Sequence, residues 1–254
     1  MVREPYTTGR RKKHTPGERA RLLLFAVMTR RSNRDMESMM ELLFPILGFK
    51  VSYKTIERLC SNVDVGCVLH NAFVLMLKDE GVSGHLAGDG TGYSLKVKDH
   101  YSSNPEKRNS AYRYSFTLID VETGLYVGYG YSSYSEKKAY SKALGMTREM
   151  GIPISSIRLD KYYSSKKILN ELTGVKAYVI PKKTIRKIGI KWNGIIREAM
   201  ADPHAFLRQY YRRNLSKTGF SADKNRFGRK LRQRREDRRA MTLLHNVFVT
   251  RVAS

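Results

Sequence analysis

Apolar residues in the first third of the chain recur at helical spacing. The segment Thr15-Pro16-Gly17-Glu18 has the form of a capping box with proline at the first helical position, so it predicts a helix over 16–29. A second helix is predicted over 33–43, because the methionines and the leucine from Met36 to Leu43 are spaced three or four residues apart. The stretch 45–48, which begins with proline and ends with glycine, is expected to end that helix.

Two shorter patterns predict two more helices before the character of the chain changes. Ser52 is expected to cap a helix over 53–62. Asp64 is expected to cap a longer helix over 65–80, and Gly81 to end it. The first third of the chain is therefore predicted to be helical throughout, with its apolar stripes forming a small core of their own.

The helix predicted over 53–62 has a polar, basic face. A short turn separates it from the helix before it, and this arrangement is compatible with a helix-turn-helix that places Tyr53, Lys54, Thr55 and Arg58 against DNA. Short helical hairpins are common in proteins, so a plain helical scaffold is the alternative interpretation.

From residue 84 the hydrophobic pattern changes to alternation. The segments 85–98, 113–121 and 125–133 alternate and are rich in aromatic and β-branched residues, which predicts three strands. A tight turn at 122–124 joins the last two strands as a hairpin. The first half of the remaining chain is therefore predicted to form an antiparallel sheet.

After the hairpin, helices and strands alternate. In chain order they are predicted as helix 135–150, strand 156–159, helix 165–172 and strand 177–180, followed by helices. This order predicts an α/β (α+β) fold with a mixed sheet flanked by helices, and it is the element order of an RNase H-like fold. In that fold the first strand lies at the sheet centre with the fourth strand beside it. The predicted domains are 1–82, all helical, and 83–254.

Charge adds a partner to this picture. The 254 residues contain 48 Lys and Arg against 23 Asp and Glu, a formal net charge of +25. Residues 1–34 hold ten Lys and Arg and two Glu, a net of +8, and residues 208–239 hold thirteen Lys and Arg and three acids, a net of +10. Concentrated basic regions of this kind are typical of nucleic-acid contact surfaces, although a solvated basic surface or a ribosomal-type RNA binder is the alternative. The predicted DNA contacts are Arg10, Arg11, Lys12, Lys13, Lys54, Thr55, Arg58, Arg212, Arg213, Lys224, Arg226, Arg229 and Lys230.

Other features argue against several classes of protein. The longest wholly apolar run, Leu22–Met28, is far shorter than the roughly 20 residues that span a bilayer. No secretory signal pattern opens the chain, and two cysteines build neither a disulfide framework nor a zinc site. We therefore expect no membrane association and a cytoplasmic, nucleoid-associated protein.

Two carboxylates are placed where such a fold could use them. Asp89 lies within the first predicted strand, and Asp160 directly follows the fourth. If those strands are neighbours, the two carboxylates converge, and their repulsion favours a cation such as Mg²⁺ or Mn²⁺ between them. A pair of such ions supports phosphodiester displacement. The alternative is a turn role for Asp89 and a helix N-cap role for Asp160.

Three segments resemble DDE-type insertion-sequence transposases. They are Asp89-Gly-Thr-Gly-Tyr-Ser, Asp160-Lys-Tyr-Tyr-Ser-Ser and the longer Tyr211-Arg-Arg-Asn-Leu-Ser-Lys-Thr-Gly-Phe-Ser-Ala-Asp-Lys-Asn-Arg-Phe-Gly228, which is the most specific. The resemblance covers roughly 84–250. It implies an RNase H-like catalytic domain with a two-metal Mg²⁺ or Mn²⁺ site and a DNA-binding region ahead of it. It also implies double-stranded DNA with terminal inverted repeats as the partner, a homodimer on DNA, donor-strand cleavage and strand transfer.

The third segment departs from the family at one position. Where the family carries the Glu that completes the metal site, this sequence has Lys217, and a protonated lysine cannot ligate Mg²⁺. Substitutes from nearby turns are Glu198, Asp202 and Asp223, of which Glu198 fits best and Asp223 lies on a different helix face. With Asp89 and Asp160 as the other site residues, two hypotheses follow. The chain is either a transposase impaired by Lys217 or an inactive, transposase-derived DNA-binding protein.

Overall fold

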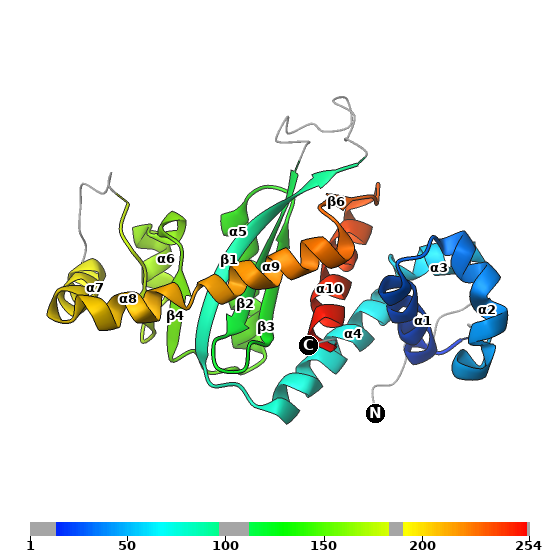
Figure 1. Ribbon diagram of the computed structural model, residues 1–254, viewed down its shortest axis with the longest axis horizontal. Helices are drawn as coiled ribbons and strands as arrows, with labels where there is room; N and C mark the ends of the chain where they lie inside the picture. The colour runs from blue at the N-terminus through cyan, green and yellow to red at the C-terminus, as the bar shows by residue number, and fades with distance from the viewer. Residues whose placement is uncertain (1–13, 97–111, 183–189, 253–254) are drawn as a thin grey trace. The chain divides into compact units, whose positions relative to one another are not determined.

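The computed structural model describes residues 14–96, 112–182 and 190–252 (Figure 1). Compact packing divides the chain into two units, one through Asn71 and one from Ala72 onward. The division falls inside the helix α4 (Val63–Glu80), whereas the sequence placed the end of the helical region at residue 82. The basic residues Arg10 to Lys13 lie outside the described residues.

The first unit is helical, as its apolar spacing predicts. It contains α1 (Pro16–Thr29), α2 (Asn33–Leu47), α3 (Tyr53–Leu59) and the first part of α4. The predicted capping box at the start of α1 is present, with Thr15 and Glu18 bonded reciprocally. The core of this unit is formed by Leu22, Leu23, Met36, Met40, Ile56, Leu59, Val65 and Leu69.

Three predicted helix boundaries in this unit were wrong. Helix α2 continues through Pro45 and ends only where Gly48 adopts a left-handed conformation, with φ of 75°. Helix α3 is shorter than predicted, and α4 begins before Asp64 because the side chain of Asn62 accepts the amide of Val65 at 3.2 Å. Among the described residues no single helix is long and apolar enough to cross a membrane, although α3 and α4 together pass that test as a bent pair, by length and composition alone.

The second unit is built on a mixed sheet. Its main strands are β1 (His85–Leu95), β2 (Tyr112–Asp120), β3 (Tyr126–Ser132), β4 (Ser156–Leu159) and β5 (Lys176–Tyr178), in the spatial order β3-β2-β1-β4-β5. Strand β1 pairs antiparallel with β2 and parallel with β4, so it lies at the centre, as the element order predicts. Residues 97 and 98, predicted as the end of the first strand, lie outside the described residues.

Helices cover both faces of this sheet, and glycines permit their close approach. On one face lies α5 (Glu136–Glu149), where a Cβ on Gly130 would come within 1.9 Å of the Ala139 carbonyl oxygen. On the other face lies α9 (Asn214–Phe227), where a Cβ on Gly219 would meet the Tyr126 hydroxyl at 2.6 Å. Figure 1 shows α9 running across the strands from β4 toward β3.

The stretch after the last main strand, predicted as helices, is divided into several elements. It contains α7 (Ile190–Ala201), α8 (Pro203–Tyr211), α9, a short strand β6 (Lys230–Leu231) and α10 (Glu236–Val252), while the short helix α6 (Lys166–Glu171) precedes β5. Strand β6 pairs in parallel with Ser94 and Leu95, and this pairing interrupts the helices. The buried Leu231 then packs with Tyr93 and Leu243.

Candidate active site

The register of β1 and β4 brings the two predicted aspartates to one part of the sheet. Gly88 pairs with Leu159, so Asp89 and Asp160 are the next residues along two adjacent parallel strands. The Asp160 carboxylate also accepts the amide of Tyr162 at 3.1 Å and so caps a 3₁₀ turn over Lys161–Tyr163. Asp160 therefore has the helix-capping contact that the alternative interpretation required, and it has it beside Asp89.

Asp89 opens onto a cleft between β1 and α9. Thr117 pairs with it across β2, on the sheet face that α9 covers. The cleft has a volume of about 340 Å³ and is lined by Asp89, Gly90, Thr91, Lys217, Phe220, Ser221, Lys224 and Arg229. One acid and three basic side chains line it, which gives the cleft a positive charge suited to an anionic ligand.

The electrostatics of Asp89 reflect this crowding. Burial raises its pKa above the usual carboxyl value. The amide of Gly90 and the ammonium of Lys217 act in the opposite direction, and the carboxylates of Glu136 and Asp160 raise the pKa further. Asp89 thus responds to the other predicted aspartate and to Lys217 at the same time, so the three predicted site positions lie within electrostatic range of one another.

Asp160 is neutralised by a different cation. An Nη atom of Arg213 lies 2.8 Å from Oδ2 of Asp160, and the Arg213 side chain is only 14% exposed. Arg213 sits at the junction of α8 and α9, directly before the first residue of α9. The helix that carries Lys217 therefore also begins at a residue bound to Asp160.

Lys224 is a further residue that lines the cleft. Its ammonium donates to Oγ1 of Thr91 at 2.5 Å and to the carbonyl oxygen of Gly92 at 3.3 Å, and it lies 5.3 Å from the centre of the Tyr93 ring. Burial lowers its pKa, the charge of Arg229 lowers it further, and Asp89 opposes both. This lysine is held against the strand that carries Asp89.

Comparison with known proteins assigns the family. No protein-family model matches the chain. Over 250 residues it is 53% identical to an Archaeoglobus fulgidus protein named "Probable transposase for insertion sequence element ISA1214", and the match covers 96% of this chain and 78% of that protein. The chain belongs to the insertion-element transposase family.

The transposase places the substitute carboxylates away from Asp89. Glu198 forms an ion pair with Lys176, whose strand neighbour is Ser156, at the opposite end of β4 from Asp160. Asp202 caps α8 by accepting the amide of Ala205 at 2.8 Å. Asp223 is buried against the hydroxyls of Tyr126 and Thr250, and burial raises its pKa.

The predicted DNA contacts fall into three groups. Lys54 and Arg58 are exposed on α3, with Tyr53 and Thr55 half-buried beside them. Lys224 and Arg229 line the cleft, and Arg226 and Lys230 lie next to it in sequence. Arg212 and Arg213, by contrast, are held in ion pairs with Glu122 and Asp160, each at an N–O distance between 2.7 and 2.8 Å.

These residues fit a divalent metal only in part. Within residues 14–96, 112–182 and 190–252, no three His, Cys, Asp or Glu side chains are grouped so that they could hold a metal ion. Asp89 and Asp160 supply two carboxylates, but Lys217 and Arg213 bring positive charge to the same place. Two ligands facing two cations do not make a complete two-metal site.

Glu136 is a site neighbour that the sequence did not reveal. A Cβ on Gly90 would lie 2.2 Å from Cγ of Glu136, so this glutamate packs against the backbone next to Asp89. The hydroxyl of the buried Tyr163 donates to Oε1 of Glu136 at 2.5 Å. The available signal was Gly90 itself, because a glycine inside a strand often marks the close approach of another group.

Proposed function

We propose that this chain acts on the ends of an insertion element, in the cleft beside Asp89, by metal-dependent phosphodiester hydrolysis and strand transfer, and that Lys217 impairs this chemistry. The observation that carries the proposal is that Asp89 on β1 lies beside Asp160, which directly follows the adjacent strand β4. Position 217 on α9 lines the same cleft as Asp89. We take the catalytic unit to be RNase H-like, on the order and direction of its strands.

Double-stranded DNA with terminal inverted repeats is the proposed partner. The charge of the cleft supports this, since Lys217, Lys224 and Arg229 line it together with a single acid, Asp89. Phosphate contacts of this type give salt-sensitive binding with little sequence preference. We assign sequence recognition to α3, where Lys54 and Arg58 are exposed, and we propose a homodimer that holds two DNA ends.

Asp89 and Asp160 are the residues that would hold Mg²⁺ or Mn²⁺. Such an ion pair, when bound, activates a water or a 3′-hydroxyl and stabilises the leaving oxygen. Lys217 replaces a carboxylate ligand by a positive charge near Asp89, and this raises the cost of bringing a dication there. We therefore propose weak metal binding and weak cleavage by the chain as it stands.

The second candidate function is DNA binding without cleavage. It is favoured by the ion pair between Asp160 and Arg213 and by the positive charge of Lys217 acting on Asp89, because both carboxylates are already under the influence of a cation. A protein of this kind would hold element ends and block their use by an active transposase.

Nicking of a labelled DNA duplex with Mn²⁺ separates the two functions. The variants are Lys217→Glu, which restores a carboxylate, Lys217→Gln, which removes only the positive charge, and Asp89→Ala as the blank. Lys142→Glu on the exposed side of α5 is the matched control, since it makes the same charge change away from the cleft. We expect Lys217→Glu to raise the nicking rate by about 100-fold, a typical worth for one electrostatic group in an active site.

Mn²⁺ binding measured by electron paramagnetic resonance gives a readout that does not depend on cleavage. Tighter binding and faster nicking by Lys217→Glu, both abolished when Asp89→Ala is added, would support the transposase. Equal gains from Lys217→Gln and Lys217→Glu would assign the effect to charge and count against a ligand position. Silence from every variant, with DNA binding intact, would favour the binding protein.

A further inference from the structure

We propose that Arg158 is a positioning residue for this active site. It fixes the end of α8 on the sheet, and so presents Arg213 to Asp160 and position 217 to Asp89. The inference rests on the proposed function for its kinetic test. Its structural test, given below, is independent of cleavage.

Arg158 is a buried cation next to the site. It lies on β4, two residues before Asp160, and is only 3% exposed. Because side chains alternate along a strand, Arg158 and Asp160 are directed to the same side of the sheet. Burying a guanidinium is costly unless its donors are satisfied, and burial lowers the pKa of this one. The acceptors of its hydrogen bonds therefore identify the parts of the fold that Arg158 connects.

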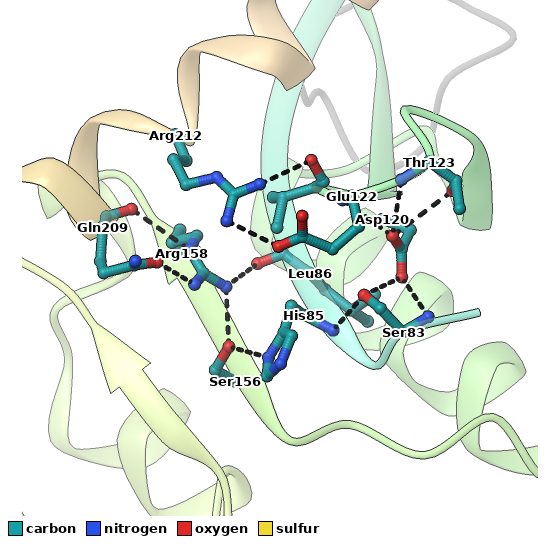
Figure 2. A network of polar contacts seen from close by, with 11 residues as sticks. Ser83, His85, Leu86, Asp120, Glu122, Thr123, Ser156, Arg158, Gln209 and Arg212 are labelled. Carbon is teal, nitrogen blue, oxygen red and sulfur yellow. Dashed lines mark hydrogen bonds and ion pairs between the residues drawn. The ribbon is translucent and has the colours of Figure 1, made fainter.

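Two of those hydrogen bonds go to one residue of α8 (Figure 2). Nε of Arg158 donates to the carbonyl oxygen of Gln209 at 3.2 Å, and Nη2 donates to Oε1 of Gln209 at 2.5 Å. Gln209 lies in the last turn of α8, which ends at Tyr211, and the carbonyls of a last turn lack partners within the helix. A cation at this end also complements the helix dipole. Arg158 thus caps the C-terminal end of α8.

The other side of Arg158 is tied to the sheet. Nη1 donates to Oγ of Ser156 at 2.7 Å and reaches the carbonyl oxygen of Leu86, on β1, at 3.5 Å. Its guanidinium carbon lies 4.9 Å from the centre of the Tyr178 ring on β5. One side chain therefore connects three adjacent strands to a single turn of helix, as the close view in Figure 2 shows for β1 and β4.

The residues after Gln209 continue this attachment toward the site. Arg212 donates to Oε1 of Glu122 at 2.7 Å and to the carbonyl oxygen of Val121 at 2.9 Å. Arg213 then binds Asp160, and Lys217 follows one helical turn later. Since α9 starts directly after Arg213, a shift of α8 on the sheet would shift position 217 relative to Asp89.

Arg158 lies on β4 and Asp160 directly follows that strand in an extended conformation, so two residues of extended backbone, about 7 Å, fix their separation. Only a planar fork reaches the carbonyl and the side-chain oxygen of Gln209 together, and a lysine has no such fork. Misplacing a group by about 1 Å can cost a catalytic site about 100-fold in rate.

The kinetic test uses the chain carrying Lys217→Glu, with Arg158→Met and Arg158→Lys added separately. We expect Arg158→Met to lower kcat for nicking by about 100-fold with little change in KM for DNA, and Arg158→Lys to recover only part of the loss. Arg148→Met is the matched control, because Arg148 also donates to a carbonyl at the end of a helix, Glu171 of α6, away from the site. If Arg158→Met and Arg148→Met lowered kcat by the same factor and changed KM equally, the inference would be overturned.

The structural test is hydrogen–deuterium exchange on the unaltered chain and on its Arg158→Met form. We expect faster exchange confined to 203–220, with α5 unchanged, whether or not the chain cleaves DNA. Gln209→Met removes only the side-chain half of the contact and serves if Arg158→Met does not fold. Exchange that rises equally in α5 and α8, or in neither, would mean that Arg158 contributes to general stability or to nothing, and would contradict a positioning role. If Lys217→Glu is inactive while exchange changes as expected, the proposed function fails and the positioning of α8 stands.

Discussion

Asp120 and Thr117 lie on β2 opposite two positions of β1, Leu86 and Asp89, and their surroundings differ. Asp120 pairs with Leu86 and accepts hydrogen bonds from the amide and hydroxyl of Ser83 at 2.8 and 2.7 Å. It also accepts the first two amides of the following turn at 3.0 and 3.1 Å. Thr117 pairs with Asp89 and is equally buried, but its hydroxyl has no hydrogen-bond partner among the described residues.

The pKa values of the two aspartates follow this difference. Burial tends to raise the pKa of Asp120, but its hydrogen bonds outweigh burial and hold the pKa below the usual carboxyl range. At Asp89 burial prevails and the pKa is raised. The polar groups around Asp120 thus have partners within the protein, whereas beside Asp89 the hydroxyl of Thr117 has none among the described residues. Such unsatisfied groups are typical of sites that await a ligand.

The largest effect is expected from removing the Asp120 carboxylate. Asp120→Ala removes the acceptor of five hydrogen bonds and should lower the free energy of unfolding by about 3 kcal/mol, because the amide of Ser83 loses its partner. Urea denaturation followed by circular dichroism measures the loss. Asp89→Ala should cost far less, since it removes an acid whose charge burial opposes. A larger loss at Asp89 than at Asp120 would reverse the comparison.

A second prediction compares two glycines of β1 that face α5. A Cβ on Gly88 would lie 2.6 Å from Cζ of Phe116 and 2.9 Å from Cδ2 of Leu159, both in the core, so Gly88→Ala should cost about 2 kcal/mol. The three atoms nearest to a Cβ on Gly90 belong to the Glu136 side chain, which can move at the expense of its hydrogen bond with Tyr163, so Gly90→Ala should cost about 1 kcal/mol. Thermal unfolding of both variants gives the difference, and equal losses would show that Glu136 is held as firmly as the core.

The sequence predicted the parts of this comparison that depend on period and order. Alternation predicted β1, a short strand was predicted at β4, and the element order made the two strands neighbours, which is why Asp89 and Asp160 were expected to lie together. Position 217 came from family resemblance, because nothing local marks Lys217 as a neighbour of Asp89.

Other parts depend on tertiary contacts that no local pattern records. Arg158 lies between the apolar residues Ile157 and Leu159 of β4. It is nevertheless buried, because Gln209 at the end of α8, far away in the sequence, accepts its hydrogen bonds. The two-residue strand β6 is too short to carry a period, so no strand was predicted after 177–180. Glu198 was the preferred third carboxylate because it lies upstream of Lys217 in a predicted helical stretch, but it forms an ion pair with Lys176 at the other end of β4.

The smallest expected effect is the change of stability with pH, which should have opposite signs for Asp89 and Asp120. The pKa of Asp89 is raised in the folded protein, so the folded state binds this proton more tightly than the unfolded chain. The free energy of unfolding should therefore fall as pH rises from the unfolded carboxyl pKa through the raised value. Asp89→Asn removes this loss and should be slightly more stable than the parent at neutral pH, with the gain disappearing in acid.

Asp120→Asn is the matched opposite. Its carboxylate has a lowered pKa, so its contribution is present above the unfolded pKa and is lost as pH falls through the folded value. This variant should be less stable than the parent at neutral pH, and the difference should shrink in acid. Urea midpoints measured from pH 3 to pH 7 give both curves. Stability curves of the same sign would mean that Asp89 is as well satisfied within the protein as Asp120, and they would contradict a ligand site at Asp89.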